Sequence, residues 1–387
     1  MKKLISLFIS LAFAGSTFAQ MSGYSTSQSN GTTLGANETL TADGIALGNA
    51  VKLRGYVDFL YSYGDADVDG TSNLDADKRF STSGDLDLLI DLSPVTSEIH
   101  LNASSNGVDL EQMFARYSFN SDFGVSFGRQ ITSLGYESDE APELFAVTNG
   151  YFADNLVTHP GVGQIISNMV DTENASRLLY NLTNGYTPLD AQYAYPVSNS
   201  DYLPKLRRNY VDGVKLNYNN GMFGFVFGLH DGYWGADDFN DNIAIDFAAS
   251  VMFFPGLEGR LGYAHQDNDN QDIGHFNAWL EWNPGDLTLA FEFDNFDFDA
   301  DQELWDIMLM ANYQFTDFLA ATIRYTHENG ENILWYNDFE SNRISLALLF
   351  SITQNFAINV EYSHTEIDTN LGDGDTDEFY VEGLVSF

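Results

Sequence analysis

The chain has 387 residues, of which 56 are Asp or Glu and 16 are Lys or Arg, so its formal net charge is −40 at pH 7. Such an acidic surface repels nucleic acid and attracts cations, which argues against a nucleic-acid partner. Aromatic residues make up 14% of the chain, glycine is plentiful with 33 residues, and cysteine is absent, which together predict an exported all-β protein with many turns.

The first predicted element is a secretory signal peptide over residues 1–19. Two lysines precede an apolar run over 4–14, and the small residues Thr17 and Ala19 precede a cleavage site before Gln20. No later run reaches the ~18–20 apolar residues that a transmembrane helix requires. The sequence therefore argues against a helical membrane protein.

The mature chain divides into a short leading segment and a long series of strands. Residues 20–50 are rich in Ser, Thr, Gly and Asn without a sustained period, which predicts a flexible N-terminal segment. From residue 51 onward, apolar and polar residues alternate with period two, as in strands with one apolar face. Sixteen strands are predicted over 51–63, 80–92, 97–105, 108–119, 122–131, 210–218, 222–231, 242–254, 257–267, 273–283, 286–298, 304–315, 318–328, 342–351, 355–366 and 377–387.

The stretch 64–77, GDADVDGTSNLDAD, has the acidic spacing of an EF-hand calcium loop over 65–70. The bidentate Glu that this motif needs at its twelfth position is replaced by Ala76. Both flanking segments alternate as strands, whereas an EF-hand has helices there. We therefore interpret 64–77 as a solvated hairpin loop and predict no metal site.

Short and long connections alternate along the strand series. Short turns such as 120–121 and 219–221 fall at one end of the strands, and most connections at the other end are longer and acidic, with 105–107 as an exception. Aromatic residues such as Phe315 and Phe318 flank the short turns, as in an interfacial girdle. The pattern predicts an all-β fold, namely a transmembrane antiparallel β-barrel of about 16 strands over residues 51–387. Its short turns would be periplasmic and its long loops would be on the outer side. The barrel would lie in the lipid of the cell outer membrane.

Two motifs carry a resemblance to a known family. The segments Gly128-Arg-Gln-Ile-Thr-Ser-Leu-Gly-Tyr-Glu137 and Gly228-Leu-His-Asp-Gly-Tyr-Trp234 resemble parts of OmpL-like β-barrel porins, although the second replaces the family's Asn-Gly-Trp-Asp. The resemblance implies a Gram-negative outer-membrane porin, a passive channel for small hydrophilic solutes or ions. By analogy with sixteen-stranded porins, it also implies a homotrimer.

An insertion of about 78 residues, 132–209, separates the fifth and sixth predicted strands. Loops of this length are often functional, and its position is similar to that of the porin loop that folds into the lumen. Strand parity places six basic residues on the lumen side, facing five acidic residues of the insertion. The candidate constriction therefore consists of Arg54, Arg116, Lys215, Arg260, Arg324, Arg343, Glu137, Asp139, Glu140, Glu143 and Asp154.

An alternative to a constriction remains open for these charged residues. Charged side chains of a membrane barrel face inward in any case, because the lipid face is unfavourable for them. Glu111 and Arg129 break the expected parity, so each lies at a rim, on a bulge, or in a strand with different bounds.

The last predicted strand ends on the C-terminal Phe387, with Phe379, Val381 and Val385 at alternating positions. This pattern resembles the C-terminal signal by which outer-membrane barrels are recognised for assembly. It predicts the barrel assembly machinery as a partner.

The net charge and the motifs together lead to a functional prediction. Acidic loops and lumenal carboxylates outnumber the inward bases, which predicts a preference for cations, although acidic chains are also typical of saline habitats. The sequence has no His-Glu-x-x-His or Gly-x-Ser-x-Gly motif, so we predict no catalytic residue, no enzyme activity and no cofactor. The alternatives are a barrel enzyme of the lipase or protease type and a structural or adhesive barrel with a plugged lumen.

Overall fold

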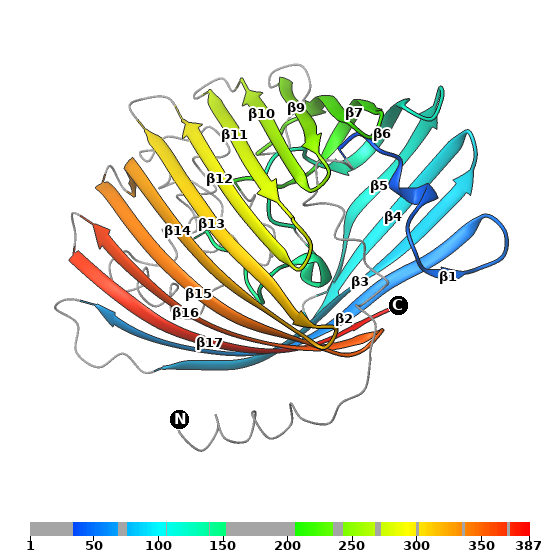
Figure 1. Cartoon of the computed structure of the whole chain (residues 1–387). Coiled ribbons are helices and arrows are strands. Elements are labelled where there is room, and N and C mark those ends of the chain that lie inside the picture. The colour runs from blue at the N-terminus through cyan, green and yellow to red at the C-terminus, as the bar shows by residue number, and fades with distance from the viewer. Residues whose placement is uncertain are drawn as a thin grey trace.

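A computed structural model describes residues 34–68, 76–105, 107–138, 140–151, 206–234, 243–267, 272–298, 302–334, 337–369 and 372–387. Within these residues nearly all of the chain is strand (Figure 1). No helix among them is long and apolar enough to cross a membrane. The predicted signal peptide lies outside the described residues.

Sixteen antiparallel strands of the described chain close into a barrel, because β17 pairs with β2 as well as with β16. Closure leaves no strand edge in contact with lipid, and it confirms the predicted fold class. The barrel strands are β2 (Val51–Val68), β3 (Asp77–Leu92), β4 (Val95–Ser104), β5 (Val108–Ser118), β6 (Phe123–Ile131), β7 (Tyr210–Asn219), β8 (Phe223–Asp231), β9 (Ile243–Phe254), β10 (Leu257–Gln266), β11 (Ile273–Trp282), β12 (Leu287–Asp297), β13 (Glu303–Thr316), β14 (Leu319–Leu334), β15 (Asn337–Thr353), β16 (Phe356–Thr369) and β17 (Gly372–Ser386). A further two-residue strand, β1 (Ile45–Ala46), pairs with the start of β2.

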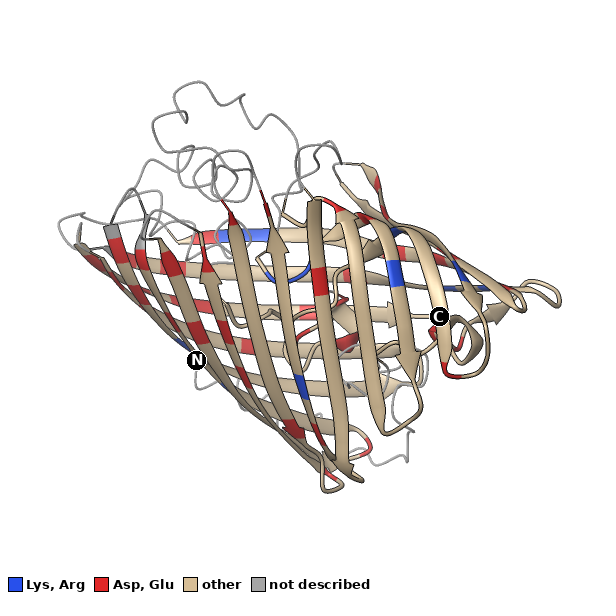
Figure 2. Cartoon of the chain, turned by 90° about the horizontal axis from the view of Figure 1, so that it is seen from above, with Lys and Arg blue, Asp and Glu red and all other residues tan. Residues whose placement is uncertain are grey.

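The barrel is apolar outside and polar inside. Along β9, the outward Ile245 and Phe247 are 36% and 39% exposed, whereas the inward Asp246 is fully buried. Along β13, Leu309 faces outward and Asp306 faces inward in the same way. A soluble barrel has the opposite polarity, so this arrangement is that of an outer-membrane barrel. Figure 2 shows acidic positions on many of the strands and far fewer basic ones.

Several strands extend beyond their predicted ends into acidic sequence. Strand β2 continues to Val68 and pairs with β17, so that Asp65 lies opposite Asp377. The predicted hairpin loop over 64–77 therefore begins too early. Apolar alternation ends where lipid ends, but backbone pairing continues into water, where polar side chains can occupy both faces.

A β-bulge explains why Glu111 breaks strand parity. In the pairing of β4 with β5, His100 lies opposite Gln112 and Leu101 lies opposite Leu110, which leaves Glu111 as the extra residue. Both Glu111 and Gln112 are buried, at 7% and 5% exposure. A bulge of this kind turns two successive side chains to the same side, here into the lumen.

The other exception, Arg129, is located near the end of β6. Its side chain is 31% exposed, and its guanidinium lies 3.6 Å from Asp212 of β7, whose side chain is 65% exposed. It follows Gly128, which has a positive φ of 121°. Arg129 thus belongs to the outer surface near the rim.

The C-terminal Phe387 closes the barrel at the start of β2. Its amide donates to the Gly55 carbonyl at 2.9 Å, and the Gly55 amide donates to the Phe387 carbonyl at 3.0 Å. A Cβ at position 55 would lie 2.9 Å from the Phe387 ring, so glycine leaves room for it. Phe379, Val381 and Val385 lie on β17, where Val385 is 43% exposed.

The short and long connections give a prediction of membrane topology. An epitope tag inserted in the short turn at 219–221 should be inaccessible to antibody on intact cells, because that turn lies on the predicted periplasmic side. A tag at 268–271, between β10 and β11, should be accessible. Permeabilised cells provide the control, since both tags should then be labelled. Labelling of the 219–221 tag on intact cells would contradict the orientation.

Candidate constriction inside the barrel

The N-terminal segment lines the inner wall near the short turns. Arg116 of β5 donates hydrogen bonds to the carbonyls of Ala36 and Gly35, the latter at 2.8 Å. Asn219 donates to the Leu34 carbonyl at 2.9 Å, and Leu34 packs against the inward face of β8 and β9. From residue 34 on, the segment predicted to be flexible therefore makes specific contacts inside the barrel.

The insertion enters the lumen through a closed neck. The Thr132 amide donates to the Asn209 carbonyl at 2.8 Å, and the Asn209 amide donates to the Thr132 hydroxyl at 3.0 Å. These bonds extend the pairing of β6 with β7 by one residue on each side. We call these two residues the neck of the insertion.

The described parts of the insertion, 132–138, 140–151 and 206–209, run along the inner wall toward the opposite side. The Tyr136 amide donates to Glu292 of β12 at 2.6 Å, and its hydroxyl donates to Glu281 of β11 at 2.8 Å. Farther along, the Val147 and Thr148 amides donate to Glu361 of β16 at 2.7 and 2.8 Å. The insertion thus lies across the lumen in these ranges.

An ion-pair cluster holds the far end of this path. Arg324 of β14 donates to Glu137 of the insertion and lies 3.7 Å from Glu361. Arg343 of β15 lies 2.6 Å from Glu378 of β17 and 3.9 Å from Glu361. All four wall residues are at most 2% exposed. The cluster and these hydrogen bonds hold Glu137, Val147 and Thr148 against β14, β15 and β16.

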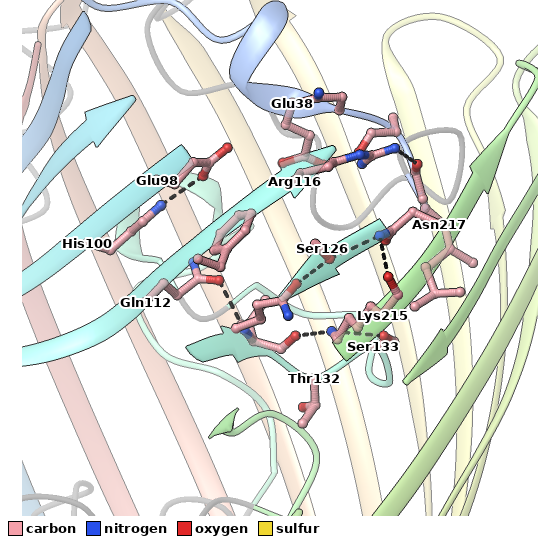
Figure 3. A pocket seen from close by; sticks show the side chains of 18 of the residues that line it. Glu38, Glu98, His100, Gln112, Arg116, Ser126, Thr132, Ser133, Lys215 and Asn217 are labelled. Atoms are coloured by element: carbon pink, nitrogen blue, oxygen red, sulfur yellow. Dashed lines mark hydrogen bonds and ion pairs between the residues drawn. The ribbon is translucent and has the colours of Figure 1, made fainter. Parts of the chain in front are cut away.

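Basic side chains surround a cavity of about 160 Å³ on the other side of the lumen (Figure 3). We call this cavity the basic chamber. Its lining includes five cationic side chains and two carboxylates: Arg54, Arg116, Arg208, Lys215, Arg260, Glu38 and Glu98. Figure 3 shows that Arg116 points toward the N-terminal segment and Lys215 toward Ser133.

Arg54 of the basic chamber lies 2.7 Å from Asp87, whereas the contacts described next for the other cations are to neutral groups. Lys215 donates to the Ile131 carbonyl and to the Ser133 hydroxyl, the latter at 3.2 Å. Arg208 donates to the Gly135 carbonyl at 3.0 Å. The Arg260 guanidinium lies 4.8 Å from the centre of the Trp279 ring, and its Nε has no hydrogen-bond partner among the described residues. The charge of a buried cation that contacts neutral groups is not offset by a neighbouring anion, so it attracts an anionic solute more strongly.

The structure separates the predicted constriction residues into two groups. Arg54, Arg116, Lys215 and Arg260 line the basic chamber, whereas Arg324 and Arg343 belong to the ion-pair cluster. Of the predicted acids, Glu137 pairs with Arg324, and Asp139 and Asp154 lie outside the described residues. The inner wall also carries carboxylates that are buried or, for Asp58, partly buried: Asp58, Asp87, Glu258, Glu281, Glu292, Asp306 and Glu361.

Glu140 and Glu143 of the insertion lie in a buried acidic region beside β3. Burial, followed by the charge of Asp85, raises the pKa of Glu140 well above its usual value. Burial raises the pKa of Glu143 to about 7, although Ser138 donates a hydrogen bond to this carboxylate at 2.8 Å. Glu140 therefore lies with Asp85 and Glu111, whereas Glu137 pairs with Arg324.

Sequence reasoning missed Arg207 and Arg208 at the end of the insertion. Arg207 donates to Asp294 at 3.1 Å and to Asp306, and its guanidinium lies 3.5 Å from the centre of the Tyr151 ring. Two successive arginines in an otherwise acidic chain were the available signal. Strand parity could not place them, because they precede β7.

Comparisons with known proteins support the fold. No family model and no curated protein matches the sequence. Among solved structures, OmpF of Salmonella typhi in complex with daunomycin has a TM-score of 0.58 at 12% identity, covering 88% of this chain and 98% of that one. An anion-selective porin from Comamonas acidovorans has a TM-score of 0.58 at 14% identity, covering 87% and 99%. OprB of Pseudomonas putida has a TM-score of 0.56 at 12% identity, covering 87% and 94%.

These similarities establish an outer-membrane porin-like barrel as the fold of the chain. They do not confirm the narrower OmpL-like family that the two sequence motifs predicted, because identities of 12–14% carry no information on subfamily.

Proposed function

We propose that this protein is a passive outer-membrane channel for small hydrophilic solutes, with the basic chamber as the site that selects among them. Its barrel has the polarity required to enclose an aqueous path, with charged side chains inside and apolar ones outside. The observation that carries the proposal is the gathering of five Lys and Arg side chains around one lumenal cavity.

Within this proposal, the chamber favours anionic solutes over cations. The chain has only 16 basic residues, and five of them line a single cavity, against the two carboxylates of Glu38 and Glu98. Since electrostatic interactions weaken with distance and with salt, the charges nearest the narrow path dominate permeation. The cation preference predicted from net charge is the competing outcome.

Reversal potentials across a salt gradient test the chamber. Replacing Lys215 and Arg260 by Gln should lower the anion-to-cation permeability ratio about sixfold per charge, because a unit charge about 8 Å away in water changes the energies of an anion and a cation by about 0.5 kcal/mol each in opposite directions. The shift should be largest in dilute salt, where the screening length is about 30 Å at 0.01 M.

Arg129→Gln provides the matched control, because it removes one positive charge from the outer surface. It should leave the permeability ratio unchanged. A wild-type channel that prefers cations would place selectivity in the acidic loops. Absence of any conductance in the wild-type protein would favour the structural or adhesive barrel instead.

The proposal extends to assembly and quaternary structure. We infer that the terminal strand with Phe387 is the segment recognised by the barrel assembly machinery. The closed barrel with an apolar outer face is also compatible with a homotrimer in lipid, and OmpT of Vibrio cholerae, at 12% identity and a TM-score of 0.51, is recorded in a trimer form.

A further inference from the structure

Three carboxylates from three separate segments meet inside the barrel. They are Asp85 of β3, Glu111 at the bulge of β5, and Glu140, which immediately precedes the short 3-10 turn η4 (Ala141–Glu143). Each offers a carboxylate oxygen, and these oxygens all lie within 4.8 Å of one another. The side chains are 4%, 7% and 6% exposed. Like charges at this distance and burial repel strongly unless something neutralises them.

Neighbouring cations are engaged elsewhere. Arg54 lies 2.7 Å from Asp87, and the two ring nitrogens of His100 lie 2.9 Å from Asp87 and from Glu98. These contacts match the two cations with two other carboxylates. Among the described residues, no Lys, Arg or His forms an ion pair with Asp85 or Glu140.

A second observation points to a missing positive ligand at Asp85. One of its oxygens, Oδ1, accepts a hydrogen bond from the Leu86 amide at 2.9 Å. The other, Oδ2, is buried, and no N–H or O–H group of the described residues donates to it, while the carboxylate of Asp87 lies within hydrogen-bonding reach of the Asp85 side chain. A buried carboxylate oxygen ordinarily has a donor or a cation beside it.

The bulge in β5 bears directly on this site. Without the extra residue at 111, strict alternation would place either Glu111 or Gln112 on the lipid side. The bulge turns both inward, and it brings Glu111 to Asp85 two strands away. Bulges commonly re-aim a side chain in this manner at functional sites.

We propose that Asp85, Glu111 and Glu140 form a divalent cation site that takes calcium. All three ligands are hard oxygen donors, which Ca²⁺ and Mg²⁺ prefer. Ca²⁺ accepts several carboxylates in a flexible geometry, whereas Mg²⁺ keeps several waters and is usually held by only one or two carboxylates. Three buried carboxylates from separate segments therefore suit Ca²⁺ better. Asp85 also lies close to Asp87 and His100, but both ring nitrogens of His100 already lie 2.9 Å from the carboxylates of Asp87 and Glu98, so we leave His100 out of the proposed ligand set.

Such an ion would connect the insertion to the barrel wall. Glu140 belongs to the insertion, while Asp85 and Glu111 belong to β3 and β5, so one bound ion would bridge three segments that are remote in sequence. Calcium would then stabilise the folded insertion. The proposal goes beyond the proposed channel function and does not depend on it.

Calcium binding by the full-length protein in detergent micelles provides the test. Isothermal titration with CaCl₂, together with thermal unfolding in CaCl₂ or in EGTA, should show one site of higher affinity and a rise in melting temperature with calcium. Asp85→Asn, Glu111→Gln and Glu140→Gln should each weaken that site at least tenfold, and the triple variant should lose both effects. Mg²⁺ should bind at least tenfold more weakly than Ca²⁺.

Glu258→Gln is the matched control, because Glu258 is also a buried carboxylate on the inner wall, at 4% exposure. It should retain the calcium site. In EGTA the melting temperature of the triple variant should be no lower than that of the wild type, because the substitutions remove repulsion between carboxylates. A melting temperature in that range serves as the check that the triple variant folds. Equal calcium binding by the wild type and the triple variant would assign the ions to the acidic loops and overturn the proposal. Absence of any calcium effect on the wild type would also overturn it and would indicate carboxyl groups that share protons.

Discussion

Removal of the insertion should increase single-channel conductance severalfold without preventing barrel formation. The variant replaces residues 133–208 by Asn-Gly between Thr132 and Asn209, which are already hydrogen-bonded to each other. Asn-Gly forms the two-residue turn that suits a β-hairpin, so β6 and β7 should remain paired. Conductance should rise because residues that cross the lumen to Glu361 are gone.

The measurement is single-channel conductance in planar bilayers, with heat-modifiable migration in gels as the check on folding. Deletion of 268–271, in the connection between β10 and β11, is the control and should leave conductance close to that of the wild type. A folded variant with unchanged conductance would show that the insertion lies outside the permeation path.

Replacement of Glu361 by Ala should destabilise the protein by about 3–5 kcal/mol, the usual cost of removing one partner from a buried ion pair. Glu361 is fully buried and lies 3.7 and 3.9 Å from the guanidiniums of Arg324 and Arg343. It also accepts hydrogen bonds from the Val147 and Thr148 amides. The substitution leaves two buried cations with less compensation and releases this part of the insertion.

Denaturant unfolding in lipid vesicles, followed by tryptophan fluorescence, measures this loss. Glu366→Ala is the control on the same strand. The Glu366 carboxylate lies 3.6 Å from His364, but the Glu366 side chain is 66% exposed to solvent. An exposed pair of this kind contributes about 1 kcal/mol or less. A loss of under about 1 kcal/mol in Glu361→Ala would indicate that water solvates the two arginines as well as the carboxylate does.

Sequence periodicity predicted the barrel well because lipid imposes it. Every residue that contacts hydrocarbon must be apolar, so alternation reveals both the strand and the direction of each side chain. All six basic residues that parity placed inside are buried there, from Arg324 at 1% exposure to Arg54 at 9%. The predicted number of sixteen strands is also that of the barrel in the described chain, which carries the two-residue β1 in addition.

The contents of the lumen could not be predicted in the same way. Residues 34–42 and Arg208 lie in segments without periodicity, and their places depend on contacts with strands remote in sequence, such as that of Arg116 with Gly35. Parity identifies the side of the sheet that a residue faces, but not its partner across the barrel. It therefore placed Arg324 and Lys215 together as candidates, although one is held by carboxylates and the other by neutral oxygens.

The neck formed by Thr132 and Asn209 makes the intervening segment an exchangeable cassette. Because the two ends of the cassette are joined by hydrogen bonds at the rim, the barrel strands do not depend on its length to stay in register. Related chains could therefore acquire new cassettes by recombination at these two positions while keeping the same wall. The same property suits the protein to nanopore engineering, where a library of grafted segments would vary the bore and the charge of one constant scaffold.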